Sequence, residues 1–257
     1  MDLITTATSS DESERAASVA VLPVGSFEQH GAHLPLVTDT VVACAIAKAV
    51  AERYDLFLLP PVTISCSHEH AAWRGTVSIS ATTLTAVVVD IARSLRASGI
   101  HRLAVINGHG GNYALANVVQ EANVAGPAMT LFPTRADWDD ARVAAGMHST
   151  AHQDMHAGEL EVSLLLHVAP EMVRDGYEQA DHLADDRRHL LTRGMDGYTT
   201  SGVIGLPSHA TPTKGKAALE ALVRSFADHH GLLPRALTTG GRPHTHNAQR
   251  TTHDARR

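Results

Sequence analysis

Apolar runs of strand length alternate with longer helical stretches along this chain, and that alternation restricts the folds open to it. Residues 19–24 form an apolar run that ends at Gly25, which is typical of a buried strand leading into a loop. Residues 41–54 place apolar side chains at helical spacing, and residues 55–59 are a second strand-length run that two prolines end. The chain therefore begins with a predicted strand, helix and strand.

The same alternation continues through most of the chain. Further strands are predicted at residues 101–106 and 128–133, and helices at residues 84–98, 113–125, 159–168 and 213–230. This order favours an α/β fold, a three-layer αβα sandwich with a mostly parallel central sheet. No repeat or interdomain linker is evident, so we expect one domain at residues 18–237. A flexible N-terminal arm is expected at residues 1–17 and a disordered tail at residues 238–257.

Composition narrows the classes of function. The formal net charge is -6 over 257 residues and no long run of Lys or Arg occurs, so neither nucleic acid nor a membrane surface is an expected partner. A small molecule is the expected partner instead. Two cysteines exclude a disulfide framework, and no segment reaches 18 consecutive apolar residues. With an acidic rather than basic beginning, the chain is expected to be cytoplasmic.

The loop after the first predicted strand carries the first set of functional candidates. Glu28 and His30 are two residues apart, so in an extended segment both side chains point to the same side, and Asp39 comes where the next helix begins. Open parallel sheets bind ligands at the carboxyl ends of their strands. Two carboxylates and an imidazole suit a divalent cation such as zinc, manganese or iron. The alternative is that Asp39 caps a helix and the other two are polar surface residues.

A glycine-rich loop follows the strand predicted at residues 101–106. It reads Asn-Gly-His-Gly-Gly-Asn over residues 107–112, and it offers His109 as a further metal ligand. The alternative is a loop whose backbone N–H groups bind phosphate. That loop lacks the lysine of a P-loop and the spacing of a dinucleotide-binding motif, so the metal ligand is the favoured interpretation.

Two more polar segments complete the candidates. Residues 155–163 open a predicted helix, where Glu159 or Glu161 would complete a metal site and His156 would transfer a proton. The alternative for both glutamates is that the helix dipole favours acidic residues in a first turn. The segment at residues 65–76 is polar and loop-like, and it is expected to line a substrate pocket.

Together these segments resemble the creatininase family, which includes formamide hydrolases of cofactor biosynthesis and the mycofactocin maturation peptidase. The resemblance spans residues 22–218 and rests on several motifs in a fixed order. These are Leu-Pro-Val-Gly-Ser-x-Glu-Gln-His-Gly-x-His-Leu-Pro-Leu-x-Thr-Asp, Glu-His with Gly-Thr-Val-Ser-Ile, Asn-Gly-His-Gly-Gly-Asn, His-Ala-Gly-Glu-x-Glu-x-Ser and Gly-Val-x-Gly.

The resemblance implies one or two divalent metal ions per subunit. Glu28 and His109 would bind one ion, His30 the other, and Asp39 would bridge them. Creatininase has a glutamate two residues after the loop histidine, where this chain has Gly111. The missing carboxylate is expected to come from Glu161 or, as second choice, from Glu159.

The resemblance also implies a reaction. A metal-activated water would attack an amide-type carbon, His156 would protonate the leaving nitrogen, and Glu161 is assigned a catalytic role as well. Ser67, His70, Gly110 and Glu159 are the expected substrate-binding residues. The expected substrate is a small-molecule amide, lactam or formamide, and a homo-oligomer, often a hexamer, is the family's assembly.

Departures from the family pattern leave the substrate open. The late segment reads Gly205-Leu206-Pro207 where relatives often have Gly-Asp-Pro, and Trp138 is the only tryptophan expected near the pocket. A peptidase of the mycofactocin maturation type and a non-catalytic metal-binding scaffold are the alternatives.

Overall fold

A computed structural model describes residues 5–233 and contains a four-stranded, entirely parallel sheet. The strands are β1 (Val19–Val24), β2 (Phe57–Leu58), β3 (Arg102–Asn107) and β4 (Met129–Phe132), in the order β2-β1-β3-β4. Val19 pairs with Arg102 and Val24 with Asn107, so β1 and β3 are neighbours in full register. Their carboxyl ends therefore lie side by side at one edge of the sheet.

The central strand β1 is buried on both faces, as its continuous apolar sequence predicts. Val19 and Val21 belong to one hydrophobic cluster, whereas Ala20, Leu22 and Val24 belong to a second cluster on the opposite face. Because side chains alternate along a strand, two apolar faces require a layer of helices on each side. The predicted three-layer αβα arrangement is confirmed.

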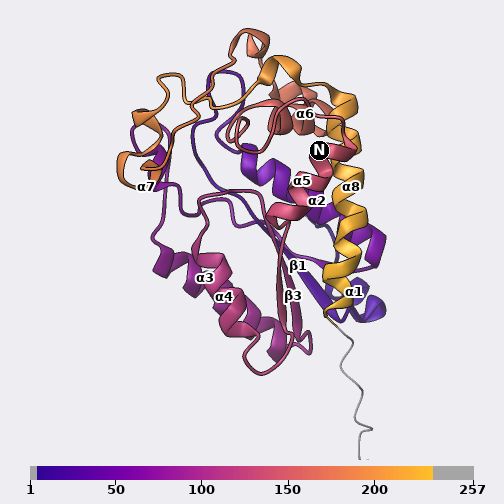
Figure 1. Ribbon diagram of the computed structural model, residues 1–257. Coiled ribbons are helices and arrows are strands. Elements are labelled where there is room, and N and C mark those ends of the chain that lie inside the picture. The colour runs from indigo at the N-terminus through magenta and orange to yellow at the C-terminus, as the bar shows by residue number, and fades with distance from the viewer. Residues whose placement is uncertain (1–4, 234–257) are drawn as a thin grey trace, which may run out of the picture.

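Two groups of helices form the outer layers (Figure 1). The first cluster joins β1 to α2 (Thr38–Tyr54), α6 (Glu159–Val168) and α8 (Pro212–Gly231), and α5 (Arg135–Ala144) packs against α8. The second cluster joins β1 and β3 to α3 (Ala81–Ala97) and α4 (Ala114–Ala122). On the first side, Phe226 of α8 is fully buried with its ring centroid 5.1 Å from that of Phe132. Burial of one such side chain contributes about 1.5–3 kcal/mol.

Polar caps define where several helices begin. The Ser80 side chain accepts a hydrogen bond from the Thr83 backbone N–H, so α3 starts at Ala81, three residues before the predicted range of 84–98. Thr134 and Asp137 form a reciprocal capping box at the start of α5, which was not among the predicted helices. Five of the ten α5 residues are charged and only Ala141 and Arg142 are buried, so the segment is too polar to stand out as a helix by its apolar residues.

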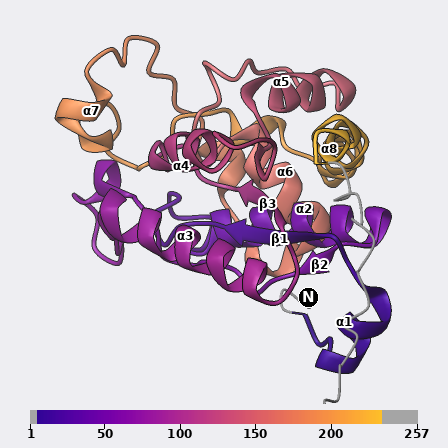
Figure 2. The ribbon, with the colours of Figure 1, turned by 90° about the horizontal axis from the view of Figure 1, so that it is seen from below.

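The N-terminal arm expected at residues 1–17 contains a short helix. Residues Ser9–Arg15 form helix α1, which Thr8 and Asp11 cap reciprocally although the helix buries none of its residues. The region after α6 has only short elements, namely η2 (Pro170–Met172), η3 (Tyr177–Gln179), α7 (Leu190–Arg193), η4 (Met195–Gly197) and η5 (Pro207–His209). Figure 2 shows α7 at the periphery, away from β1 and β3. The tail predicted at residues 238–257 lies outside the described residues, and the domain limits at 18 and 237 stay a prediction.

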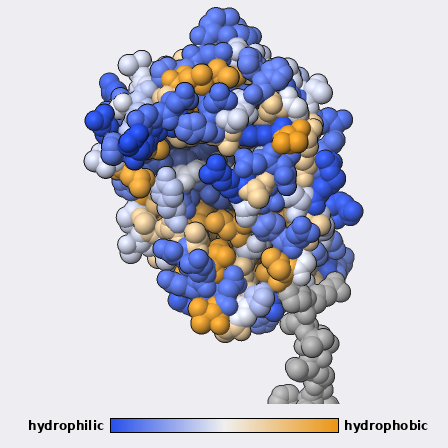
Figure 3. Space-filling view, in the orientation of Figure 1, coloured by the Kyte–Doolittle hydropathy of each residue, from blue (hydrophilic) through white to orange (hydrophobic). Residues whose placement is uncertain are grey.

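None of the described helices is both long and apolar enough to cross a bilayer. On the face shown in Figure 3, apolar side chains form separate patches between polar ones.

Candidate metal centre and cleft

Close backbone packing places the candidate ligands together. Glu28 and His30 follow β1, His109 follows β3, and Asp39 is in the first turn of α2. A Cβ on Gly25 would lie 2.4 Å from the backbone of Thr40, and a Cβ on Gly108 would lie 2.3 Å from the Asp39 carbonyl oxygen. Only glycine therefore allows the two strand-end loops to contact the start of α2 this closely.

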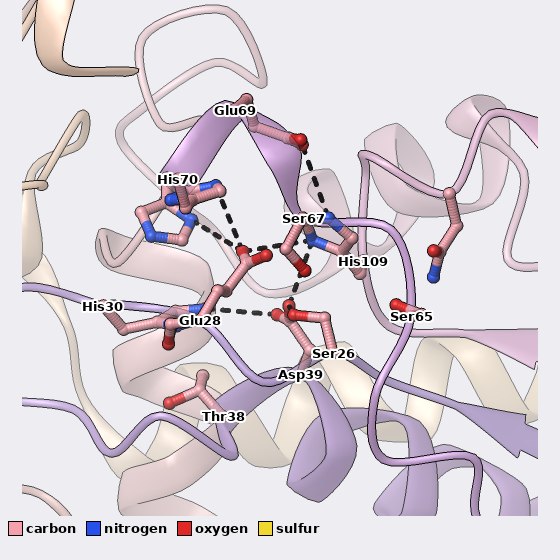
Figure 4. A network of polar contacts seen from close by, with 12 residues as sticks. Ser26, Glu28, His30, Thr38, Asp39, Ser65, Ser67, Glu69, His70 and His109 are labelled. Atoms are coloured by element: carbon pink, nitrogen blue, oxygen red, sulfur yellow. Dashed lines mark hydrogen bonds and ion pairs between the residues drawn. The ribbon is translucent and has the colours of Figure 1, made fainter. Parts of the chain in front are cut away.

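Asp39 lies at the centre of the resulting cluster (Figure 4). Its Oδ1 is 3.1 Å from His30 Nε2, and its Oδ2 is 3.1 Å from His109 Nδ1. The Ser26 hydroxyl donates a hydrogen bond of 2.8 Å to the same Oδ2. Glu28 Oε1 lies 3.1 Å from His109 Nδ1, so three segments of the chain meet at one point.

The cluster contains two three-residue groups that share Asp39. One consists of Glu28, Asp39 and His109, and the other of His30, Asp39 and Glu161, each with its ligand atoms within 4.8 Å of one another. Glu28 is fully buried, and neither of its carboxylate oxygens has a hydrogen-bond partner among the described residues. A buried carboxylate without hydrogen bonds is costly unless a cation compensates it. The residues therefore fit divalent cations, in the arrangement expected for a bridging Asp39.

The electrostatics of the cluster also favour cations. Burial alone would lower the pKa of His30, but Asp39, with help from Glu161 and Glu28, outweighs it and raises the pKa to about 9. Burial raises the pKa of Glu161 to about 7, and the neighbouring Asp39 charge adds to this effect against the opposing influence of His30. Carboxylates thus dominate the potential at this point.

Two further histidines lie against the same cluster. His156 is buried, and its Nδ1 is 3.9 Å from Glu28 Oε1. Burial lowers its pKa well below the ordinary range, and His30 and His70 reinforce the shift, so the ring is neutral. His70 Nε2 lies 3.2 Å from Glu28 Oε1. Both histidines therefore lie close to Glu28, one of the candidate metal ligands.

Glu159 lies apart from the cluster. Its carboxylate accepts hydrogen bonds from the backbone N–H groups of His148 and Ser149 and from the Ser149 hydroxyl, and it forms an ion pair of 2.6 Å with Lys214. These contacts connect Glu159 to the loop before α6 and to the first turn of α8. The prediction that Glu159 binds substrate or replaces the missing metal ligand therefore finds no support in its contacts.

The remaining predicted substrate-binding residues lie at the cluster. Ser67 is buried, and its hydroxyl has no hydrogen-bond partner within the described part of the chain. Figure 4 shows it beside Glu28 and His109. Gly110 lines the adjoining cavities and has open space where a Cβ would stand.

The space beside Gly111 is occupied by the carboxylate of Glu69, which comes from another loop. A Cβ on Gly111 would lie 2.0 Å from Glu69 Oε1, and that oxygen is 3.4 Å from His109 Nε2. Residues 65–76 were predicted to line a pocket, but no role was predicted for Glu69. None was predicted for Ser26 or Gln29 either, although both lie within the first motif.

The glycine-rich loop gives little support to phosphate binding. The Gly108 N–H donates to the Val24 carbonyl and the His109 N–H donates to the Asn107 side chain, so both are engaged within the protein. A phosphate-binding loop needs such groups free.

A cleft leads from the cluster to the surface. A cavity of about 130 Å³ lies directly over His70, His109, His156 and Glu161. A larger cavity of about 660 Å³ shares His109, Gly110, Tyr113, Met155 and Glu161 with it. Arg135, Trp138 and Arg187 line the outer part. The predicted pocket tryptophan is thus in the wall of the larger cavity.

Comparison with known proteins agrees with the motifs. The Creatininase family model, described as creatinine amidohydrolase, matches residues 4–229. A mycofactocin precursor peptide peptidase from Mycobacterium ulcerans (strain Agy99) is 36% identical over 216 residues, which is 79% of this chain and 80% of the relative. A creatinine amidohydrolase from Pseudomonas putida is 28% identical over 228 residues, 82% of this chain and 87% of the relative.

Solved creatininase structures have a similar fold. A manganese creatininase superposes with a TM-score of 0.74 at 25% identity, covering 89% of this chain and 98% of the other. A variant creatininase described as Zn-Zn type has a TM-score of 0.72 at 24% identity, covering 91% of this chain and 100% of the other.

The chain therefore belongs to the creatininase family of amidohydrolases. Within that family, the mycofactocin precursor peptide peptidase, at 36% identity, is more similar in sequence than the creatinine amidohydrolase, at 28% identity.

Proposed function

We propose that this protein is a metal-dependent peptidase that hydrolyses an amide bond in a peptide of the mycofactocin precursor type. The observation that carries the metal dependence is the pair of ligand groups that share Asp39. Asp39 Oδ1 faces His30 and Asp39 Oδ2 faces His109, so this one carboxylate would serve both ligand groups. Glu161 supplies the carboxylate that Gly111 cannot.

The residues of the cluster have two separate roles, metal binding and proton transfer. Glu28, His30, Asp39, His109 and Glu161 would hold one or two ions of zinc, manganese or iron. A bound cation supplies a Lewis acid that polarises the amide oxygen and makes water more acidic. His156 is neutral and faces the cluster, so it can accept a proton from the attacking water and deliver it to the leaving nitrogen.

The cleft supports a peptide as substrate. The larger cavity, about 660 Å³, is in the range of sites for drug-sized ligands, so it can accept several residues of a peptide beyond the reacting bond. The relative at 36% identity is named for action on a precursor peptide. Arg135 and Arg187 offer polar contacts in the outer wall.

A small-molecule amide, lactam or formamide is the second candidate substrate. The inner cavity of about 130 Å³ favours it, because that space at the ligands would accept a small ring or formyl group alone. The relative at 28% identity is named for action on creatinine. A homo-oligomer and a cytoplasmic location remain predictions for either substrate.

The test is metal analysis followed by a substrate panel. Purified protein is loaded in turn with zinc, manganese and iron, and it is assayed against the mycofactocin precursor peptide, overlapping fragments of it, creatinine, lactams and formamides. Cleavage of the precursor peptide with a matching cation supports the proposal. Turnover of a small amide with no peptide cleavage would contradict the peptidase assignment, and metal binding without any turnover would favour the non-catalytic scaffold.

One variant tests whether the activity depends on the cluster, and a second variant serves as its control. His156→Gln should keep its metal and lose most of its activity, by roughly 10²–10⁴-fold for a general acid–base residue. Gln120→Glu, a charge change at an exposed position of α4, is the matched surface control and should behave as wild type. Loss of metal from His156→Gln would count against its role in proton transfer.

A further inference from the structure

Gln29 lies between His70 and His156, and every polar group of its side chain is engaged. Its Nε2 donates to His70 Nδ1 at 2.9 Å and to the Gly202 carbonyl at 3.1 Å, while its Oε1 accepts from the Gly31 N–H at 3.0 Å. The residue is buried, so these contacts are made away from water. An amide with two donors and one acceptor thus meets partners for all of them.

The backbone fixes which way this amide points. The Gly31 N–H can only donate and the Gly202 carbonyl can only accept. The reverse orientation would place oxygen against oxygen at Gly202 and nitrogen against N–H at Gly31. Gly202 also has a positive φ of 87°, and a Cβ there would lie 1.7 Å from Gln29 Oε1, so only glycine leaves room for the amide.

The fixed amide determines the tautomer of His70. Because the amide nitrogen donates to His70 Nδ1, that ring nitrogen carries no proton. The proton of the neutral ring is then on Nε2, the atom that lies 3.2 Å from Glu28 Oε1. His70 therefore directs an N–H donor toward the metal cluster.

The backbone of Gln29 determines the tautomer of His156. Its carbonyl oxygen lies 2.7 Å from His156 Nε2 and can only accept, so Nε2 carries the proton. His156 Nδ1 is left bare, 3.9 Å from Glu28 Oε1. The Gln29 side-chain nitrogen is also 3.2 Å from His156 Nε2, but both atoms are donors there and their hydrogens go to other partners.

We propose that Gln29 is a positioning residue that gives two neighbouring histidines opposite roles at the cluster, with His70 as hydrogen-bond donor and His156 as proton acceptor. The two rings lie 4.5 Å apart, between centroids, and both line the inner cavity. Applied to the proposed hydrolysis, on which this assignment of roles rests, His70 donates to the oxygen that gains negative charge. His156 takes the proton from water as the C–O bond forms, and it returns the proton to nitrogen as the C–N bond breaks.

Neutron diffraction from perdeuterated, zinc-loaded crystals tests the tautomers directly. We expect deuterium on Nε2 of both His70 and His156, and none on either Nδ1. Deuterium on Nδ1 of either ring would overturn the proposal. The measurement needs no substrate and no variant, so it succeeds or fails independently of whether the protein cleaves peptides.

The variant Gln29→Glu separates the effect of the Gln29 side-chain amide on His70 from the effect of its backbone carbonyl on His156. It keeps the shape of the residue but replaces the amide donor with a carboxylate, which can only accept when ionised. We expect deuterium to move to Nδ1 of His70, with loss of deuterium from its Nε2, while His156 stays unchanged as the internal control because the carbonyl of residue 29 remains. A bare Nδ1 on His70 in this variant would refute the role of the side chain. If the variant does not fold, the wild-type structure alone still decides the proposal.

Discussion

Replacement of Glu159 by glutamine should destabilise the protein rather than alter its substrate binding. The carboxylate is fully buried and is bonded to Lys214, Ser149 and His148. Burial alone would raise the pKa of Glu159, but the hydrogen bonds from these three residues outweigh it and hold the pKa at about 2 instead of 4.5. The folded state therefore favours the ionised form strongly.

The magnitude follows from that pKa. Each pH unit between the folded and unfolded pKa corresponds to about 1.36 kcal/mol, so ionised Glu159 contributes roughly 3 kcal/mol to the free energy of unfolding at neutral pH. Glutamine has nearly the same shape and carries no charge, so Glu159→Gln should remove this contribution. For a chain of this size the melting temperature should fall by roughly 6–12 °C.

The pH dependence has a definite sign. A lowered folded pKa means that the contribution is fully present above pH 4.5 and is lost as the pH falls toward 2. Urea unfolding at pH 7, 5 and 3 should therefore show a large gap between wild type and Glu159→Gln at the first two values and a smaller gap at the third. Equal stability at pH 7, or a gap that does not narrow in acid, would refute this reasoning.

An exposed ion pair provides the matched control. Glu220 lies 3.9 Å from Lys216 on the surface of α8, with more than half of each side chain exposed. Glu220→Gln removes the same charge but should change the stability by less than about 0.5 kcal/mol. If Glu159 bound substrate instead, its variant would lose activity while unfolding like this control.

Two further variants test the metal cluster, and a third, with its own control, tests the packing around Gln29. Asp39→Asn should lose both cations by elemental analysis together with activity, because this carboxylate belongs to both ligand groups; retained metal with full activity would contradict the bridging role. Glu161→Gln should reduce bound metal from two equivalents to one, and unchanged stoichiometry would assign the second ligand elsewhere. Gly202→Ala should unfold in urea with a loss of about 1–3 kcal/mol, whereas Gly126→Ala, at another positive φ but with open space, should lose less. Equal losses would mean that displacement of Gln29 costs nothing.

The sequence was sufficient to predict the layers of the fold and most of the cluster. Residues 19–24 were predicted as a strand with the observed limits, since a strand buried on both faces is continuously apolar. Glu28, His30, Asp39 and His109 meet because their loops end adjacent parallel strands or start the next helix. Such placement depends on local pattern and topology, which the sequence carries.

Other features depend on contacts that no local pattern encodes. Glu159 and Glu161 stand two residues apart in one helical turn, and which of them faces the cluster depends on the helix orientation and on the partner Lys214, 55 residues later. The polar helix α5 depends on a capping box and on packing against α8. The role of Gln29 depends on Gly202, which approaches it from 173 residues away.

The wall of the cleft and the metal ligands come from different parts of the chain. Ligands project from strand ends and the first turns of α2 and α6, whereas Arg135, Trp138 and Arg187 belong to α5 and the segment before α7. Substitutions in these outer segments can therefore reshape substrate choice without disturbing the reacting groups. A single catalytic core of this kind can serve peptides in one relative and small rings in another, and redesign of selectivity should begin at α5.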